Sequence, residues 1–269
     1  MPVASGGVSD SGVADIRTAR LAWWSDGESR GDPLVLVHAG VADARMWEPL
    51  LPALTAGHRV VRYDMRGFGR TRSAPGRFAA ARDLAGLLDA LGIARAHVVG
   101  ASFGGQVALE LAATQPTRVA SLVLLAPALP DMAPTPALQA YADAEDRAIA
   151  DGRIDDAVEL NVQMWAGASA PAVRALVADM QRSALELQLH EGAEDDVLDP
   201  PVSARLAAIQ APATIAIGDR DVAVFTSVAE RLLAELPQAT LRHVAAAGHL
   251  LALDQPDVVA ELILRQVDA

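Results

Sequence analysis

A serine stands between two glycines in the segment Gly100-Ala101-Ser102-Phe103-Gly104. The apolar run 96–99 precedes this segment, and the apolar helical pattern QVALELAATQP follows it. A G-x-S-x-G string between a strand and a helix predicts a tight turn that exposes the serine oxygen. Glycines permit the strained backbone of such a turn, and the helix N-terminus favours a developing negative charge. Ser102 is therefore the candidate nucleophile.

A serine hydroxyl is a poor nucleophile until a base accepts its proton. His249 is the candidate base, because it lies on a loop that follows the predicted strand 239–244 and the small residues Ala246-Ala247-Gly248. His243 lies within the strand pattern itself, so we expect a structural role for it. The sequence therefore predicts a serine–histidine pair.

A carboxylate should hold the tautomer of the base, and the expected chain order is serine, acid, histidine. The predicted strand 213–217 ends in Gly218-Asp219-Arg220-Asp221. In open α/β sheets, ligands bind at the carboxyl ends of the parallel strands, so polar residues there are candidates for the site. Asp221 is the preferred acid, Asp219 is the first alternative, and Asp131 is a more distant one.

A developing oxyanion needs two backbone N–H donors. One should be Phe103, the residue after the nucleophile, and the other should come from the loop after the first long strand, 33–38. That loop reads His38-Ala39-Gly40-Val41, and Gly40 is the candidate donor. We expect His38 to order this loop through hydrogen bonds rather than to act as a base.

These residues must be positioned by an alternation of short apolar strands and longer helices, which is typical of an α/β fold: a mostly parallel, doubly wound sheet with helices on both faces. The segment 15–25 suggests an antiparallel hairpin at one edge. The predicted strands are 33–38, 59–63, 96–101, 120–126, 213–217 and 239–244, and the predicted helices are 46–56, 78–91, 103–115, 224–236 and 256–267.

The alternation stops after Pro127 and resumes near residue 208. We therefore predict a flexible N-terminal tail over 1–14, a core domain formed by 15–129 and 208–269, and a helical cap inserted over 130–207. Between Ala128 and Arg205 there are 15 acidic and 5 basic residues, so most of the net charge of −12 lies in the cap. The acidic cap is interpreted as a solvated helical face, or as a lid that repels anionic substrates.

The composition excludes several classes of chemistry. The 269 residues include no cysteine and no lysine, which excludes thiolate nucleophiles, Cys-based metal sites, a lysine Schiff base and a Walker-type P-loop. A negative chain does not suit nucleic acid or anionic membranes. We expect a cytoplasmic monomer or homodimer that binds a small-molecule substrate and uses no metal and no cofactor.

At these residues the chain resembles the α/β-hydrolase family, in the subgroup with a helical cap. The resemblance covers about residues 20–267. It implies the triad Ser102, Asp221 and His249, with Phe103 and Gly40 as oxyanion donors. The family usually has glycine where this chain has Ala39, whose methyl group could shift the oxyanion loop. The matching motifs are LVLVHAG, Met46-Trp47, YDMRGFGRT, LLDALGI, VVGASFGG, GDRD and GHLLALDQP.

The resemblance implies hydrolysis of a small, neutral ester or lactone through an acyl-enzyme. The residues expected to line the pocket are Leu129, Met132, Met164, Trp165 and Leu250. The same triad also serves C–C bond hydrolysis, acyl transfer and perhydrolysis. Two alternatives from other classes are a cofactor-independent oxygenase that uses the His–Asp pair, and a ligand receptor with slow turnover. Asp64 and Arg66, in YDMRGFGR, are expected to brace the active-site loops.

Overall fold

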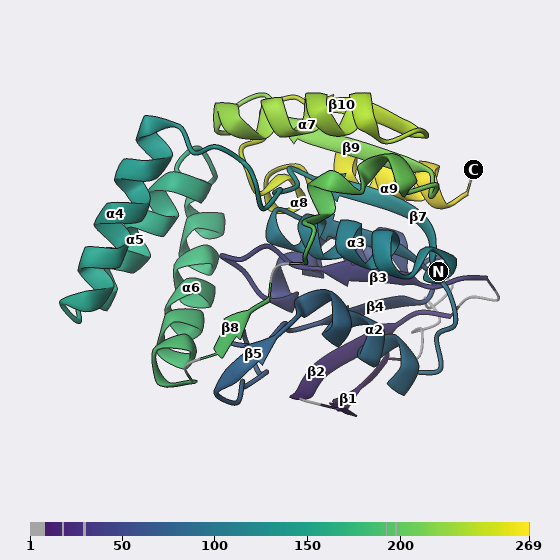
Figure 1. Cartoon of the computed structure of the whole chain (residues 1–269), viewed down its shortest axis with the longest axis horizontal. Helices are drawn as coiled ribbons and strands as arrows, with labels where there is room; N and C mark the ends of the chain where they lie inside the picture. Colours follow the sequence, from purple (N-terminus) through teal and green to yellow (C-terminus); the bar gives the residue numbers. More distant parts are fainter. Residues whose placement is uncertain (1–8, 18, 29–30, 192, 197, 269) are drawn as a thin grey trace, which may run out of the picture.

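A computed structural model describes residues 9–17, 19–28, 31–191, 193–196 and 198–268 (Figure 1). Its centre is an eight-stranded sheet with the order β1-β2-β4-β3-β6-β7-β9-β10. β1 and β2 form an antiparallel edge hairpin, β2 pairs antiparallel with β4, and every later pairing is parallel. The predicted mostly parallel α/β sheet with an antiparallel edge hairpin is confirmed. The strands are β1 Ser9–Ile16, β2 Ala19–Asp26, β3 Leu34–Val37, β4 Val60–Tyr63, β6 Ala96–Ala101, β7 Val119–Leu125, β9 Ala213–Gly218 and β10 Ala239–Val244.

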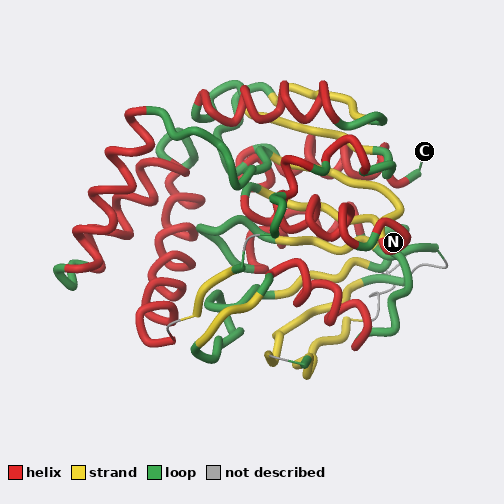
Figure 2. The backbone as a smooth tube through the Cα atoms, in the orientation of Figure 1, coloured by secondary structure: helices red, strands yellow, loops and turns green. Residues whose placement is uncertain are grey.

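Helices cover both faces of the sheet (Figure 2). Alternate residues of the buried strands face opposite layers, as the two-residue period of a strand requires. Val35 and Val37 of β3 face one hydrophobic cluster, and Leu34 and Leu36 face the other. The helices of the core are α1 Leu51–Leu54, α2 Ala80–Ala90, α3 Phe103–Thr114, α7 Ala223–Glu235, α8 Leu251–Asp254 and α9 Pro256–Val267.

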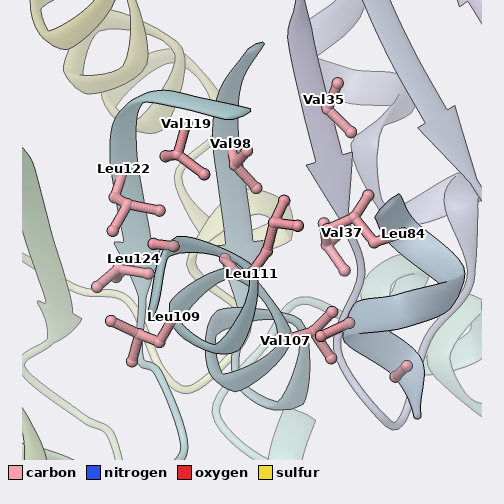
Figure 3. Packing of buried hydrophobic residues seen from close by; sticks show 14 of the residues in the cluster. Val35, Val37, Leu84, Val98, Val107, Leu109, Leu111, Val119, Leu122 and Leu124 are labelled. Carbon is pink, nitrogen blue, oxygen red and sulfur yellow. The ribbon is translucent and has the colours of Figure 1, made fainter. Parts of the chain in front are cut away.

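The helix that follows the serine is held against the middle of the sheet. Val107, Leu109 and Leu111 of α3 pack with side chains of β6, β7 and β3, and all of these side chains belong to one buried cluster (Figure 3). Truncating such a buried leucine to alanine lowers the free energy of unfolding by about 2–5 kcal/mol. Because these contacts are so stabilising, the cluster holds α3 in one position against the sheet. This packing places the N-terminus of α3 at the carboxyl end of β6.

Three helices lie between β7 and β9 in the chain, in the segment predicted as a cap: α4 Pro136–Ala150, α5 Ile154–Ala166 and α6 Pro171–Glu191. They form a group at one end of the sheet, to the left in Figure 1. Pro136 and Pro171 occupy the first helical positions of α4 and α6, where a missing N–H costs nothing. Thr135 caps α4, because its side chain accepts the N–H of Leu138.

The cap segment is not entirely helical, and that expectation is corrected. A short strand, β8 Ala193–Asp195, follows α6 and pairs in parallel with β5 Gly76–Phe78. Each strand has three residues, which is too few for any apolar periodicity to appear. The two-stranded sheet ties the end of the cap to the core.

Two further expectations are wrong in detail. The predicted tail over 1–14 is incorrect from Ser9 onward, because Ser9–Ile16 is the edge strand β1; residues 1–8 lie outside the described chain. Most side chains of β1 are exposed and backbone pairing with β2 holds the strand, so hydropathy carries no signal. The predicted helix 46–56 is a 3-10 helix, η1 Ala44–Leu50, followed by the four-residue α1; Pro49 removes a donor from η1.

Candidate active site

Ser102 lies at the sharp turn between β6 and α3. Its backbone angles are φ 51° and ψ −116°, in a region that non-glycine residues rarely adopt. A Cβ on Gly100 would lie 2.3 Å from the carbonyl oxygen of Gly104, and a Cβ on Gly104 would lie 2.2 Å from that of Val37. The two glycines are therefore required for the turn to fit, as the sequence pattern predicts.

His249 and Asp221 form a buried pair. His249 Nδ1 lies 2.9 Å from Asp221 Oδ1 and 3.2 Å from Oδ2, and the side chains are 3% and 1% exposed. The backbone N–H of Val222 also donates to Oδ1, at 2.7 Å. Since Oδ1 accepts from Val222, the carboxylate is fixed in the orientation that accepts from the imidazole.

The two alternative acids lie elsewhere. Asp219 is half exposed, and its carboxylate is 3.7 Å from His243 rather than from His249. Asp131 forms an ion pair with Arg231 at 3.0 Å, on the surface. Arg231 lowers the pKa of Asp131, so that carboxylate stays charged and paired. The geometry therefore favours Asp221 over both.

Within the described part of the chain, the Ser102 hydroxyl makes no hydrogen bond. The residue is partly exposed, and its carbonyl accepts the N–H groups of Gly105 and Ala128. Catalytic hydrogen bonds are often long before substrate binds and tighten afterwards. No other described residue therefore holds the hydroxyl in place before substrate binds.

The two candidate oxyanion donors are neighbours. A Cβ built on Gly40 would lie 3.6 Å from Cβ of Phe103, so the loop after β3 and the first turn of α3 are in contact. The methyl group of Ala39 is fully buried, in the same cluster as Met46 and Trp47. The core therefore accommodates the alanine that stands where the family usually has glycine.

His38 orders this loop, as the sequence analysis expects. Its Nε2 accepts the N–H of Met65 at 2.9 Å, so its Nδ1 carries the proton and donates to the carbonyl of Ala39 at 2.8 Å. Full burial lowers the pKa of His38, which keeps the ring neutral. Both nitrogens are thus occupied by the backbone.

Asp64 and Arg66 brace the neighbouring loop. Asp64 accepts the backbone N–H groups of Ala44 and Arg70, at 2.9 and 2.7 Å. Arg66 forms a buried ion pair with Asp83 and lies over the ring of Phe78. These contacts agree with the expectation that Asp64 and Arg66 brace the active-site loops.

Two aromatic side chains contact the ring of His249. The centroid of Phe225 lies 4.2 Å away, and that of Trp165, from the cap helix α5, lies 4.8 Å away. Trp165 and Phe225 also contact each other edge to face, at 6.1 Å. Since Trp165 comes from the cap, the cap reaches the candidate base directly.

A chain of hydrogen bonds within the cap holds Trp165. Its indole N–H donates to the hydroxyl of Tyr141 at 3.1 Å, and that hydroxyl donates to Oδ1 of Asn161 at 2.7 Å. The buried amide of Asn161 donates to Glu145 and to the carbonyl of Ala157. Burial and the nearby Glu145 raise the pKa of Tyr141, so the hydroxyl remains a donor.

The five residues predicted to line the pocket occupy different places. Trp165 contacts His249, as described above. Leu129 and Met132 line a groove beside α7, and Leu250 is buried in the core. Met164 is half-buried on α5. Phe225, Tyr141 and Asn161 are outside this prediction, because Phe225 reaches His249 through the packing of α7 in the core, and Tyr141 and Asn161 reach the site only through the cap residue Trp165.

The described residues hold no group of three or more His, Asp or Glu side chains that could bind a metal ion. Across the same residues, no helix is both long and apolar enough to cross a membrane.

A family model described as alpha/beta hydrolase fold matches residues 32–256. The chain belongs to the α/β-hydrolase family. The match includes the turn at Ser102, Asp221 and His249. It also includes the whole inserted segment of helices α4–α6, so family membership rests on most of the chain.

Several individual proteins are similar to this α/β-hydrolase. A protein of Caulobacter segnis named as a carbamate hydrolase, RutD, is 29% identical over 246 residues, which is 87% of this chain and 91% of that protein. RutD of Variovorax paradoxus is 46% identical over 107 residues, but these are only 38% of each chain. The match to the Variovorax protein therefore covers well under two thirds of that protein's length.

Solved structures agree with the fold. The crystal structure of a hydrolase from Pseudomonas aeruginosa has a TM-score of 0.78 and 28% identity, covering 97% of this chain and 99% of that one. The enol-lactonase of Burkholderia xenovorans has a TM-score of 0.80 at 23% identity, covering 96% and 100%. The second likeness is evidence for the fold alone.

Proposed function

We propose that this α/β-hydrolase cleaves a small, neutral ester or lactone through Ser102, His249 and Asp221. The observation that carries the proposal is the buried hydrogen bond between His249 Nδ1 and Asp221, which leaves Nε2 for a serine proton. Ser102, on the strained turn at the start of α3, supplies the hydroxyl. These are the three parts of a nucleophile activated by an oriented base.

The first step forms an acyl-enzyme. Ser102 Oγ attacks the carbonyl carbon while His249 Nε2 accepts its proton, and Asp221 stabilises the resulting imidazolium. The N–H groups of Phe103 and Gly40 bind the oxyanion, and the helix dipole of α3 adds to this stabilisation. The C–O bond to the alcohol then breaks as His249 returns the proton to the leaving oxygen.

The second step releases the acid. A water molecule attacks the acyl-enzyme while His249 accepts one of its protons, and the Ser102–carbonyl bond breaks as that proton passes to Oγ. Trp165 and Phe225 keep the imidazole in place and exclude bulk water from its faces. A drier site strengthens the charge–charge and hydrogen-bond interactions that stabilise the imidazolium and the oxyanion.

A carbamate is the second candidate substrate. The support is the match to the protein named RutD, which extends over 87% of this chain. A carbamate carbonyl is attacked in the same way, and nitrogen replaces oxygen on one side of it. C–C hydrolysis, acyl transfer and perhydrolysis use the same three residues and remain alternatives that substrate profiling separates.

The test is hydrolysis of p-nitrophenyl esters by the wild type and by Ser102→Ala. Loss of the serine should reduce kcat by about 10⁶-fold, to a residual rate set by the oxyanion donors and binding. Native turnover by a folded Ser102→Ala variant would overturn the proposal. Oxygen uptake that survives the substitution would point to the oxygenase alternative, and tight binding without turnover to a receptor.

A further inference from the structure

A groove lies beside the candidate active site, between the segment that follows β7 and the helix α7. Its volume is about 360 Å³, which lies within the range of small-molecule sites. The residues on the α7 side are Ala223, Val224, Ser227, Val228 and Arg231. Their spacing of three to four residues places them on one face of the helix.

The interior of the groove is mostly apolar. Leu129, Val224 and Val228 are buried, and Met132 packs against both hydrophobic clusters of the core. The ion pair between Asp131 and Arg231 lies on the surface at the same groove. An apolar interior with charges confined to an ion pair suits an uncharged hydrocarbon chain.

Both walls of the groove are adjacent in the chain to residues that contact Ser102 or His249. The N–H of Ala128 donates to the carbonyl of Ser102 at 3.0 Å, and Leu129 is the next residue. On the opposite wall, Phe225 follows Val224 and contacts the His249 ring at 4.2 Å. The groove and the candidate active site therefore share the backbone segments on both sides.

We propose that this groove binds the acyl chain of the substrate. The inference rests on the proposed function, because it assigns a subsite to the same nucleophile. The acyl group remains bonded to Ser102 through both steps, and one wall of the groove belongs to the segment that hydrogen-bonds to the backbone of Ser102. The leaving group departs at His249, which Trp165 covers.

The experiment fills the groove without touching the core. Ser227 is exposed on α7 and lines the groove, so Ser227→Trp places an indole in the path of the chain. Ala234→Trp is the matched control, because Ala234 is exposed on the same helix two turns away and is not among the groove residues. Thermal unfolding of both variants confirms that they fold.

The readout is kcat/KM for p-nitrophenyl esters from acetate to decanoate. Each methylene buried in an apolar site contributes about fourfold in kcat/KM. The ratio of octanoate to butyrate should therefore fall at least tenfold in Ser227→Trp and stay within twofold of wild type in Ala234→Trp. A parallel series of acetate esters with lengthening alcohols should be unaffected. An unchanged acyl series, or an effect on the alcohol series instead, would overturn the assignment.

Binding separates this inference from the proposed reaction. 2-Octanone and 2-butanone are neutral acyl mimics that need no turnover, and calorimetry with Ser102→Ala measures their affinity directly. We expect 2-octanone to bind at least tenfold more tightly than 2-butanone, and the preference to vanish when Ser227→Trp is added. If esters are not hydrolysed but this preference is present, the reaction is wrong and the groove stands. If the two ketones bind equally, the groove assignment fails.

Discussion

Replacing Asp221 with asparagine should remove a charge while keeping the geometry of the base. Oδ1 accepts from Val222 N–H at 2.7 Å and lies 2.9 Å from His249 Nδ1. The amide oxygen of asparagine should occupy this position, because the amide NH₂ cannot accept the Val222 proton. The imidazole then keeps its tautomer, and only the carboxylate charge is lost.

The size of the loss follows from the separation of the charges. Two unit charges about 4 Å apart attract each other by about 4 kcal/mol at an effective dielectric constant of about 20. This attraction stabilises the imidazolium that forms in the transition state, so kcat/KM should fall by about 10³-fold. An amide that turned its NH₂ group toward Nδ1 would select the wrong tautomer and cost about 10⁴-fold.

The assay is hydrolysis of the best p-nitrophenyl ester by Asp221→Asn, with Asp219→Asn as the matched control. Asp219 lies on the same loop but is half exposed and faces His243, so its variant should keep kcat/KM within twofold of wild type. A loss of less than tenfold in Asp221→Asn, or an equal loss in both variants, would refute the role assigned to Asp221.

Three other predictions concern the turn, the cap and the pH dependence of stability. Gly100→Ala should abolish ester hydrolysis, because its Cβ would lie 2.3 Å from a backbone oxygen, whereas Gly57→Ala, which meets nothing within 4 Å, should retain full activity. Tyr141→Phe removes the partner of the Trp165 N–H and of Asn161 Oδ1, so the free energy of unfolding measured in urea should fall by about 1–3 kcal/mol. A Tyr141→Phe variant as stable as wild type would contradict the role given to this chain of hydrogen bonds. Burial lowers the pKa of His97 below 6.5 in the folded protein. As the pH falls past 6.5, His97 therefore takes up a proton in the unfolded chain before it does so in the folded chain. The free energy of unfolding of the wild type should therefore fall as the pH is lowered from 7 to 5. In His97→Gln this fall should be smaller, and an equal fall in both proteins would refute the role given to His97.

The sequence predicts the inner strands of the sheet well because β3, β4, β6, β7 and β9 are buried on both faces. Strands 96–101 and 239–244 and helix 256–267 are predicted with their observed bounds. Pro237 lies just before strand 239–244 and Pro256 begins helix 256–267, so proline marks where these two elements start. Residues 9–14 of the edge strand β1 are predicted as a tail because the side chains there are mostly exposed, and β8 is missed because three residues show no periodicity.

The motifs of the site are also visible in the sequence, but their surroundings are not. Ser102 and Asp221 each follow a buried strand and His249 follows the edge strand β10, so the fold gathers them at one edge of the sheet. The contact of Trp165 with His249 depends on how the cap packs, and that of Phe225 depends on how α7 packs in the core. No local pattern encodes that packing, so pocket residues such as Met164 could be chosen only by their type.

Trapping the acyl-enzyme would test the central claim most directly. The protein is mixed rapidly with a p-nitrophenyl ester, the release of p-nitrophenol is followed, and the quenched protein is digested and analysed by mass spectrometry. The account predicts a burst of about one p-nitrophenol per chain and an acyl group on the peptide that contains Ser102, with neither in Ser102→Ala. An acyl group on another residue, or steady turnover that leaves Ser102 unmodified and survives its removal, would contradict it.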